Sequence, residues 1–152
     1  VSQECNLRLS NTESQLVQQA LNGTKSLTQL YLKSSPDQNE TYELTLSIHE
    51  ELLASLILFI TDSDGSDIGE RTLFCNRILK FYYDQFLPQM SEKPLLNGED
   101  IIHQFQLSPS PIFGRILNDI QKAQVLGKIT TPKDAVTLAG NIIQSQTKEP
   151  NG

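Results

Sequence analysis

The stretch 108–122 carries the residues that are best suited to hold an anion. Pro109 and Pro111 each fix their own φ and disfavour helix in the preceding residue, so the chain must turn sharply here. Ser110 can then be the N-cap of a new helix, with Pro111 at the first helical position. Backbone N–H groups at a helix start attract anions, and the helix dipole adds to this. We therefore predict an anion site in which Ser110, Ile112 and Phe113 supply N–H groups.

Two cations stand beside that turn. Arg115 lies on the first turn of the predicted helix, and Lys122 follows seven residues later on the same face. The other interpretation is structural: Ser110 only caps its own helix, and Arg115 is a solvated side chain. The sequence leaves the two open. The predicted phosphate-binding set is Ser108, Ser110, Ile112, Phe113, Gly114, Arg115 and Lys122.

A second group of cations, Arg71, Arg77 and Lys80, lies on a long helix that we predict from 68 to about 87. Such a strip could face a polyanion. Charges on a long amphipathic helix are more often simply its solvated face. The strip is therefore the weaker of the two binding hypotheses.

Three carboxylates, Asp62, Asp64 and Asp67, give the acidic stretch 61–67 the look of a calcium loop. The glycine stands at the fourth place rather than the sixth, and no glutamate follows at the twelfth. We favour an acidic connection between two helices, without a metal, in which Gly65 takes a left-handed turn.

The sequence predicts no catalytic residue and no cofactor site. His49 and His103 each lack a neighbouring nucleophile and an orienting carboxylate. Cys75 falls in an apolar helix, where a small core residue is a better interpretation than a nucleophile.

Size and composition narrow the class of protein. A chain of 152 residues is long enough for one domain or two small lobes, and its first residue, valine, suggests a fragment. A net charge of −6 argues against nucleic-acid binding by overall charge, although it permits a local basic strip. No apolar run reaches ~18 residues, so we expect no membrane span. Cys5 and Cys75 have no CxxC partner, which suits a reducing, cytoplasmic location.

Apolar residues recur at helical spacing, and no segment alternates in the way that a strand does. We predict an all-α fold, an array of about eight short helices with no sheet. S-x-x-E capping boxes at Ser10 and Ser47 should each begin a helix, and Gly23 should end the first. Ser35, followed by Pro36, should begin another.

Three further features define the later helices. The segment 52–60 is apolar almost all round, so it should be the most buried helix. Pro88 and a second proline at 94 should flank a loop. Gly127 should end the helix that begins at Pro111, and Thr131 should cap the next one, with Asp134 completing a capping box.

The stretch 94–139 resembles the helical C-terminal region of bacterial tRNA nucleotidyltransferases of the poly(A) polymerase family, the CCA-adding type. Two departures stand out: Ser110 replaces a usual glycine and Lys122 a usual glutamate, which makes that helix face more basic. Before residue 69 the resemblance is weaker. The matching residues are Pro94, Leu95, Leu96, Gly98, Asp100, Leu107, Pro109, Pro111, Gly114, Leu117, Ala123, Gln124, Gly127, Ile129, Thr131 and Ala135.

The resemblance implies a region that binds and positions tRNA and does not catalyse in isolation. Residues 1–67 would follow the family's HD-type module, 68–147 would form a long helix plus tail helices, and 148–152 would be a disordered tail. The parent's catalytic head would transfer CMP and AMP from CTP and ATP with Mg²⁺ held by paired carboxylates. The expected partners are tRNA and that head, with no DNA and no membrane. On this interpretation the anion site and the strip would contact RNA phosphates.

An alternative of a different class is a helical protein–protein interaction module with no RNA role. The acidic charge favours it. The expectations from the resemblance and this alternative are both open at the level of the sequence.

Overall fold

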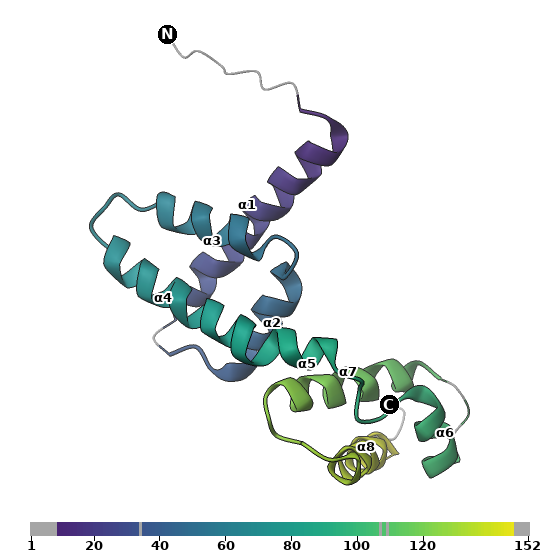
Figure 1. Cartoon of the computed structure of the whole chain (residues 1–152). Coiled ribbons are helices and arrows are strands. Elements are labelled where there is room, and N and C mark those ends of the chain that lie inside the picture. The colour runs from purple at the N-terminus through teal and green to yellow at the C-terminus, as the bar shows by residue number, and fades with distance from the viewer. Residues whose placement is uncertain (1–8, 34, 107, 109, 148–152) are drawn as a thin grey trace. The chain divides into compact units, whose positions relative to one another are not determined.

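A computed structural model describes residues 9–33, 35–106, 108 and 110–147 (Figure 1). Within these ranges the chain is helical and has no strand, so the all-α prediction is confirmed. The elements in order are α1 (Asn11–Tyr31), α2 (Gln38–Ile48), α3 (Leu52–Thr61), α4 (Ile68–Phe81), the π-helical turn η1 (Tyr82–Phe86), α5 (Leu87–Ser91), α6 (Gly98–Phe105), α7 (Pro111–Val125) and α8 (Pro132–Thr147).

The chain divides into two compact units, unit 1 (Val1–Phe81) and unit 2 (Tyr82–Gly152). The sequence predicted a division between 67 and 68, which would have placed α4 with the later helices. In the structure α4 contacts α2 and α3, so it lies with unit 1. The predicted disordered tail, 148–152, lies outside the described residues.

Unit 1 is built on the close approach of α1 and α3. The prediction that Gly23 ends the first helix is wrong, because α1 continues through it to Tyr31. Gly23 is buried, and a Cβ placed there would stand 2.1 Å from Ser55 Oγ on α3. Thr24 Oγ1 also donates to the Ser55 carbonyl oxygen at 3.2 Å. The glycine therefore permits two helices to touch rather than stopping one of them.

An aromatic cluster packs one turn further along α3, four residues after Ser55. The rings of Tyr31, Phe59 and Phe74 come from α1, α3 and α4, with centroids 5.4 to 5.7 Å apart. Phe59 is fully buried and Phe74 nearly so. Tilted and edge-to-face arrangements of this kind stabilise aromatic pairs beyond the area that they bury.

Two predicted helix starts in unit 1 are wrong. The first residue of α2 is preceded by Asp37, not Ser35, as N-cap, and Asp37 forms a full capping box with Glu40. The expected box at Ser47 does not form either. Instead α2 ends at Ile48, and Glu51 precedes α3 without a side-chain cap. Packing on α1 must therefore hold α3 in place. The box of Ser10 with the glutamate at 13 is confirmed.

The expectation that 52–60 is the most buried helix holds for one side of α3 only. Leu52, Leu56 and Phe59 are buried, but Leu53 and Ile57 are 56% and 63% exposed. The apolar residues around α3 therefore do not mean that every side of this helix is buried.

The prediction that Pro88 and Pro94 flank a loop is wrong for the first proline. Pro88 lies inside α5, directly after η1. Proline lacks the N–H that would pair with the carbonyl four residues earlier, and here the wider π-helical turn η1 immediately precedes α5. The chain therefore stays helical to Ser91.

Unit 2 is built around α7. The buried side chains of Ile116 and Ile120 lie at the centre of its core. Two of its helices begin with a capping box. Thr131 and Asp134 form the predicted one, and Asn97 forms one with Asp100 that was not predicted. The other buried members of this core are Leu96, Ile101, Ala123, Ile129, Ala135 and Ala139.

Gly127 ends α7 as predicted. Its φ is +66°, in the left-handed region that favours glycine. The Gly127 N–H donates to the Gln124 carbonyl at 3.0 Å, and the Lys128 N–H donates to the Ala123 carbonyl at 2.8 Å. This pair of hydrogen bonds is the Schellman arrangement, which satisfies two carbonyls at the helix end.

We expect Gly23→Ala to destabilise unit 1 by about 1–3 kcal/mol, because the added methyl group overpacks the contact with Ser55. Thermal and urea unfolding measure the effect. Gly69→Ala is the matched control, since nothing lies within 4 Å of a Cβ at that position on α4. Equal stability of the two variants would contradict the proposed crossing of α1 and α3.

Ser55→Ala should leave the free energy of unfolding unchanged or raise it. Ser55 Oγ is buried and has no hydrogen-bond partner in the described part of the chain. Removing a buried, unpaired hydroxyl removes a desolvation cost. The same unfolding measurements check this, and a loss of stability similar to that of Gly23→Ala would count against it.

Candidate nucleic-acid interface

The start of α7 has the backbone geometry that the sequence predicted. Ser110 is the N-cap, with φ −154° and ψ 164°, and Pro111 begins the helix. The Ser110 side chain makes no capping hydrogen bond to the helix. The Phe113 N–H donates to the Ser110 carbonyl oxygen at 3.0 Å. The hydroxyl therefore does not fulfil the purely structural role that was the alternative interpretation.

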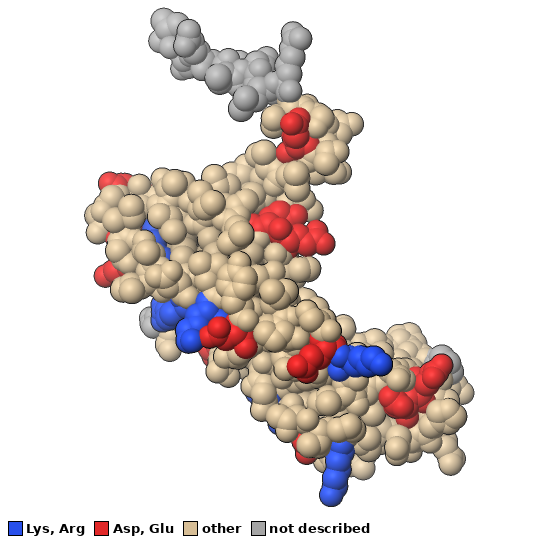
Figure 2. Space-filling view, viewed as in Figure 1, with Lys and Arg blue, Asp and Glu red and all other residues tan. Residues whose placement is uncertain are grey.

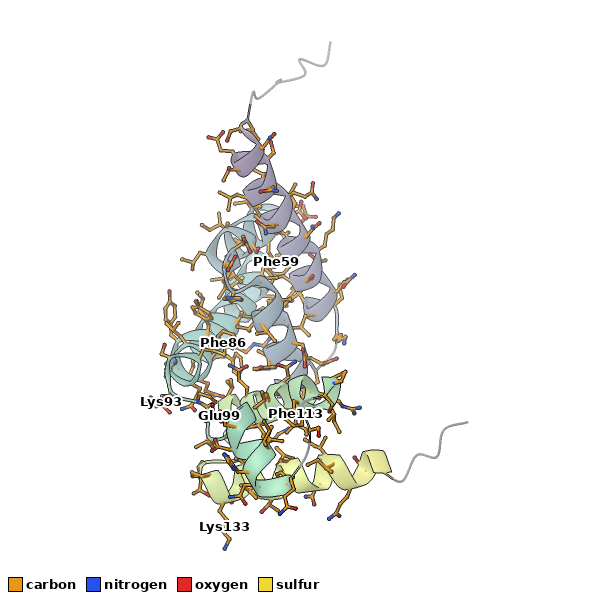
Figure 3. All side chains as sticks on the ribbon, turned by 90° about the vertical axis from the view of Figure 1, so that its right-hand side faces the viewer. Phe59, Phe86, Lys93, Glu99, Phe113 and Lys133 are labelled. Carbon is orange, nitrogen blue, oxygen red and sulfur yellow. The ribbon has the colours of Figure 1, made fainter. Side chains whose placement is uncertain are left out.

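The residues of this turn divide between core and surface. The half-buried side chains of Ile112 and Phe113 pack against the core of unit 2 (Phe113 is labelled in Figure 3). The Phe113 N–H, predicted as a donor to the anion, is already used by the Ser110 carbonyl. Ser108 and Gly114 are exposed, and nothing described lies within 4 Å of a Cβ at Gly114. Pro109 lies outside the described residues.

Arg115 is the exposed cation of this turn. Its side chain is 65% exposed, and its Nε lies 4.0 Å from an Asp119 carboxylate oxygen, a weak surface pair. Lys122 is half-buried and already has an interaction partner, so it is not a free cation. The structure thus leaves Arg115 as the side chain of the predicted set that is most open to a polyanion.

The second predicted strip is not a row of three exposed cations. Arg71 turns into unit 1: its Nε lies 2.7 Å from an Asp67 carboxylate oxygen, and its Nη1 donates to the Phe59 carbonyl at 2.7 Å. The guanidinium also lies 4.7 Å from the centroid of the Phe59 ring, a cation–π contact. Arg77 and Lys80 are exposed on α4. Arg71 therefore stabilises unit 1, and the strip stays a prediction for Arg77 and Lys80.

The acidic loop after α3 uses its carboxylates internally. Asp64 accepts hydrogen bonds from the Ser66 N–H and hydroxyl, and these bonds lower the pKa of Asp64. Hydrogen bonds from the Ser63 hydroxyl and then from Arg71 lower the pKa of Asp67. Gly65 takes the predicted left-handed conformation, with φ +97°. In the described ranges, no three His, Cys, Asp or Glu side chains are grouped so that they could hold a metal ion.

Charge is distributed unevenly between the two units. The sequence places six basic and eleven acidic residues in 1–81, against six and seven in 82–152. Most of the net negative charge therefore belongs to unit 1. The face drawn in Figure 2 shows acidic and basic groups interspersed among uncharged residues. Lys133, on the first turn of α8, points away from its helix (Figure 3).

The remaining candidate residues are the two histidines and the two cysteines. His49 and His103 are exposed, and Cys75 is buried, where burial raises the pKa of its thiol. Cys5 lies outside the described residues. Among the described helices, none is by itself both long and apolar enough to cross a membrane. The pair α2 and α3 would reach that length and composition together, but the two meet at 108°.

A group of amide side chains on α7 was not predicted from the sequence. Asn118, Gln121 and Gln124 recur at intervals of three, beginning one turn after Arg115. This spacing places them along one side of a helix and could have been noticed.

Comparison with known proteins places the chain in a family. The model of the tRNA nucleotidyltransferase domain 2 family matches residues 5–139. The chain belongs to this family. The resemblance over 94–139 is therefore confirmed, and the match extends it upstream to residue 5.

One similar protein is the CC-adding tRNA nucleotidyltransferase of Synechocystis sp. (strain ATCC 27184 / PCC 6803 / Kazusa), which is 34% identical over 53 residues. That match covers 35% of this chain and 13% of the relative, so the chain aligns with a small part of it. No solved structure matches the chain.

We expect Arg71→Ala to lower the melting temperature clearly and Arg77→Ala to leave it nearly unchanged. Arg71 loses the Asp67 pair, the Phe59 carbonyl bond and the ring contacts, whereas Arg77 is exposed on the same helix. Circular-dichroism melting of both variants measures this. Equal melting temperatures would show that Arg71 is not structural.

Asp67 should give the chain an acid-dependent stability. Its folded pKa is lowered, so the carboxylate stabilises the fold above the unfolded pKa of about 3.9, and this is lost as the pH falls through the folded pKa. Wild type should therefore melt above Asp67→Asn at pH 7, with the gap closing below about pH 4. Ser63→Ala, which removes the largest cause of the shift, should reduce the gap. A gap that is constant from pH 2 to 7 would contradict this origin.

Proposed function

We propose that this chain is the tRNA-holding region of a tRNA nucleotidyltransferase and that the chemical step takes place elsewhere in the parent chain. Membership of the tRNA nucleotidyltransferase domain 2 family supports the proposal. So does the similarity to a relative whose name describes addition of CC to tRNA. The region contributes by positioning, since holding the RNA body fixes where its 3′ end can react. A tRNA-handling enzyme of this kind would work in the cytoplasm.

The start of α7 is the observation that carries the proposal. The helices α1, α2, α6 and α8 each have an acidic residue in the first turn, next to their free N–H groups. Helix α7 has no acidic residue there and no side-chain cap, and it carries Arg115 instead. An RNA phosphate at this position would receive backbone N–H groups, the helix dipole and a guanidinium. Contacts of this kind hold RNA without reading its sequence, which suits an enzyme that acts on many tRNAs.

The nucleotidyl transfer belongs, in this proposal, to a catalytic head. That head would use Mg²⁺ with CTP or ATP. The described residues offer no cluster of metal-binding side chains, so they do not fit such a centre. We therefore place no chemical step in this chain, and its partners would be tRNA and the head.

The second candidate is a protein–protein interaction module, and exposed apolar side chains in unit 1 favour it. Leu16 and Val17 on α1 are 52% and 47% exposed, and α3 exposes Leu53 and Ile57. Such side chains mark a contact surface where they form one contiguous patch.

Titration of the chain with labelled tRNA across a salt series tests the proposal. Arg115→Ala should weaken binding several-fold and reduce the slope of log K against log salt by about 1, since one phosphate contact is lost. Lys133→Ala is the matched control, because it also removes one exposed cation from unit 2 but lies on α8. An equal effect of both variants would sink the α7 site. Self-association that does not change with salt concentration, together with no tRNA binding, would support the interaction module instead.

A further inference from the structure

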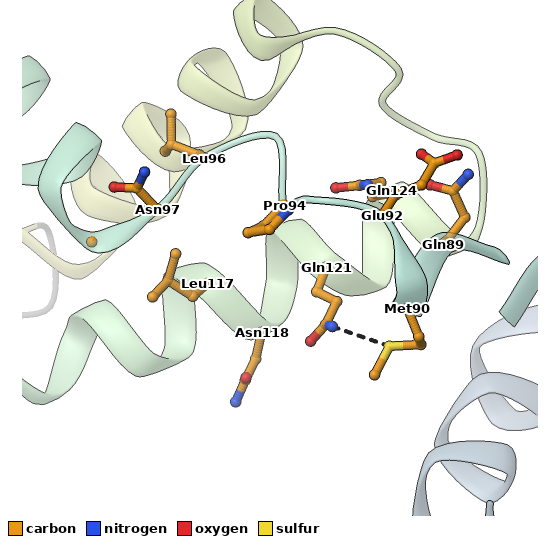
Figure 4. A pocket seen from close by; sticks show the side chains of 11 residues that line it. Gln89, Met90, Glu92, Pro94, Leu96, Asn97, Leu117, Asn118, Gln121 and Gln124 are labelled. Atoms are coloured by element: carbon orange, nitrogen blue, oxygen red, sulfur yellow. Dashed lines mark hydrogen bonds between the residues drawn. The ribbon is translucent and has the colours of Figure 1, made fainter. Parts of the chain in front are cut away.

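A pocket of about 290 Å³ lies within unit 2, between the chain that follows α5 and the outer side of α7 (Figure 4). Amide side chains predominate among its polar lining residues. Gln89 contributes from α5, and Asn118, Gln121 and Gln124 contribute from α7. Pro94, Leu96 and Leu117 supply apolar walls. Neither the fold nor the α7 anion site accounts for this concentration of amides.

Two of these amides are held in defined positions. Gln124 is only 7% exposed, and its Oε1 accepts the Leu95 N–H at 3.2 Å, so the backbone fixes the carboxamide in the pocket wall. Gln121 Nε2 points at the Met90 sulfur, 3.0 Å away (Figure 4). A thioether is a weak acceptor. The Gln121 N–H group can therefore transfer to a better acceptor at little cost.

The lining selects the chemistry of a ligand. No Lys or Arg lines the pocket, and Glu92 is its ionisable member, so the interior does not suit a phosphate. Apolar walls suit flat ring faces, and carboxamides offer a donor and an acceptor side by side. Asn and Gln pair in this way with the edges of nucleobases, and RNA-binding proteins recognise unstacked bases by hydrogen bonds to these edges.

We propose that this pocket receives an unpaired nucleobase of the bound RNA. The inference rests on the proposed function, because it treats the pocket and the start of α7 as one site. Asn118 follows Arg115 by three residues, so the two are neighbours on the surface of α7. A nucleotide with its base among the amides would then have its phosphate near the guanidinium. The same base chemistry could come from a free nucleotide, and the experiment separates the two sources.

Gln121→Met tests the pocket, because methionine matches glutamine in shape but has no amide. Its affinity for labelled tRNA should fall roughly tenfold while the salt slope stays unchanged, since a base contact and not a phosphate contact is lost. Gln104→Met, at an exposed position on α6, is the matched control and should bind like the wild type. Circular-dichroism melting confirms that both variants fold. In wild type, millimolar adenosine, cytidine, guanosine or uridine should shift the side-chain amide NMR signals of Gln121.

The outcomes separate this inference from the proposed function. If tRNA binding depends on Arg115 but Gln121→Met binds normally and no nucleoside shifts its amide signal, the pocket proposal is overturned and the proposed function stands. If nucleosides shift that signal but tRNA does not bind, the pocket takes the base of a free nucleotide, and both the inference about bound RNA and the proposed function are overturned. If neither ligand binds, both proposals fail.

Discussion

Burial of one face of α7 is the constraint on which unit 2 depends. Helices α5, α6 and α8 all contact α7, and its residues Ile116 and Ile120 are almost completely buried. A helix that repeats every 3.6 residues cannot bury these positions without turning Arg115 and Asn118 outward. Packing of the core therefore determines which side chains of α7 are exposed to a ligand. The same packing holds the candidate site in place.

Unit 1 depends on a different kind of contact. Gly23 leaves room for the Ser55 side chain of α3 against the backbone of α1, and this packing holds α3, which has no side-chain cap. One turn further along α3, Arg71 connects the loop, through Asp67, to the Phe59 carbonyl and to the aromatic cluster. Most of the acidic excess of the chain lies in this unit, where Arg71 neutralises only part of it.

Features set by neighbouring residues could be predicted from the sequence, and features set by distant residues could not. The Thr131 box and the helix end at Gly127 involve groups within a few residues of each other, and both were predicted. Gly23 gives the same local signal as a helix end, but its outcome is decided by Ser55 on another helix. Arg71 and Arg115 look alike in sequence. The Asp67 carboxylate, the Phe59 carbonyl and the aromatic rings that the fold brings beside Arg71 show that it is structural.

A net charge of −6 and a site for a polyanion are compatible, because several carboxylates in this chain interact with the start of their own helix. Glu13, Glu40, Asp100 and Asp134 each accept a backbone N–H bond at the start of a helix. There each carboxylate interacts with the positive end of that helix's dipole, and the two charges partly cancel. At the start of α7 no carboxylate does this, so the same dipole faces outward beside a guanidinium. What a passing phosphate meets at α7 is set by this local arrangement, because charges further away than about 8 Å are largely screened at physiological salt.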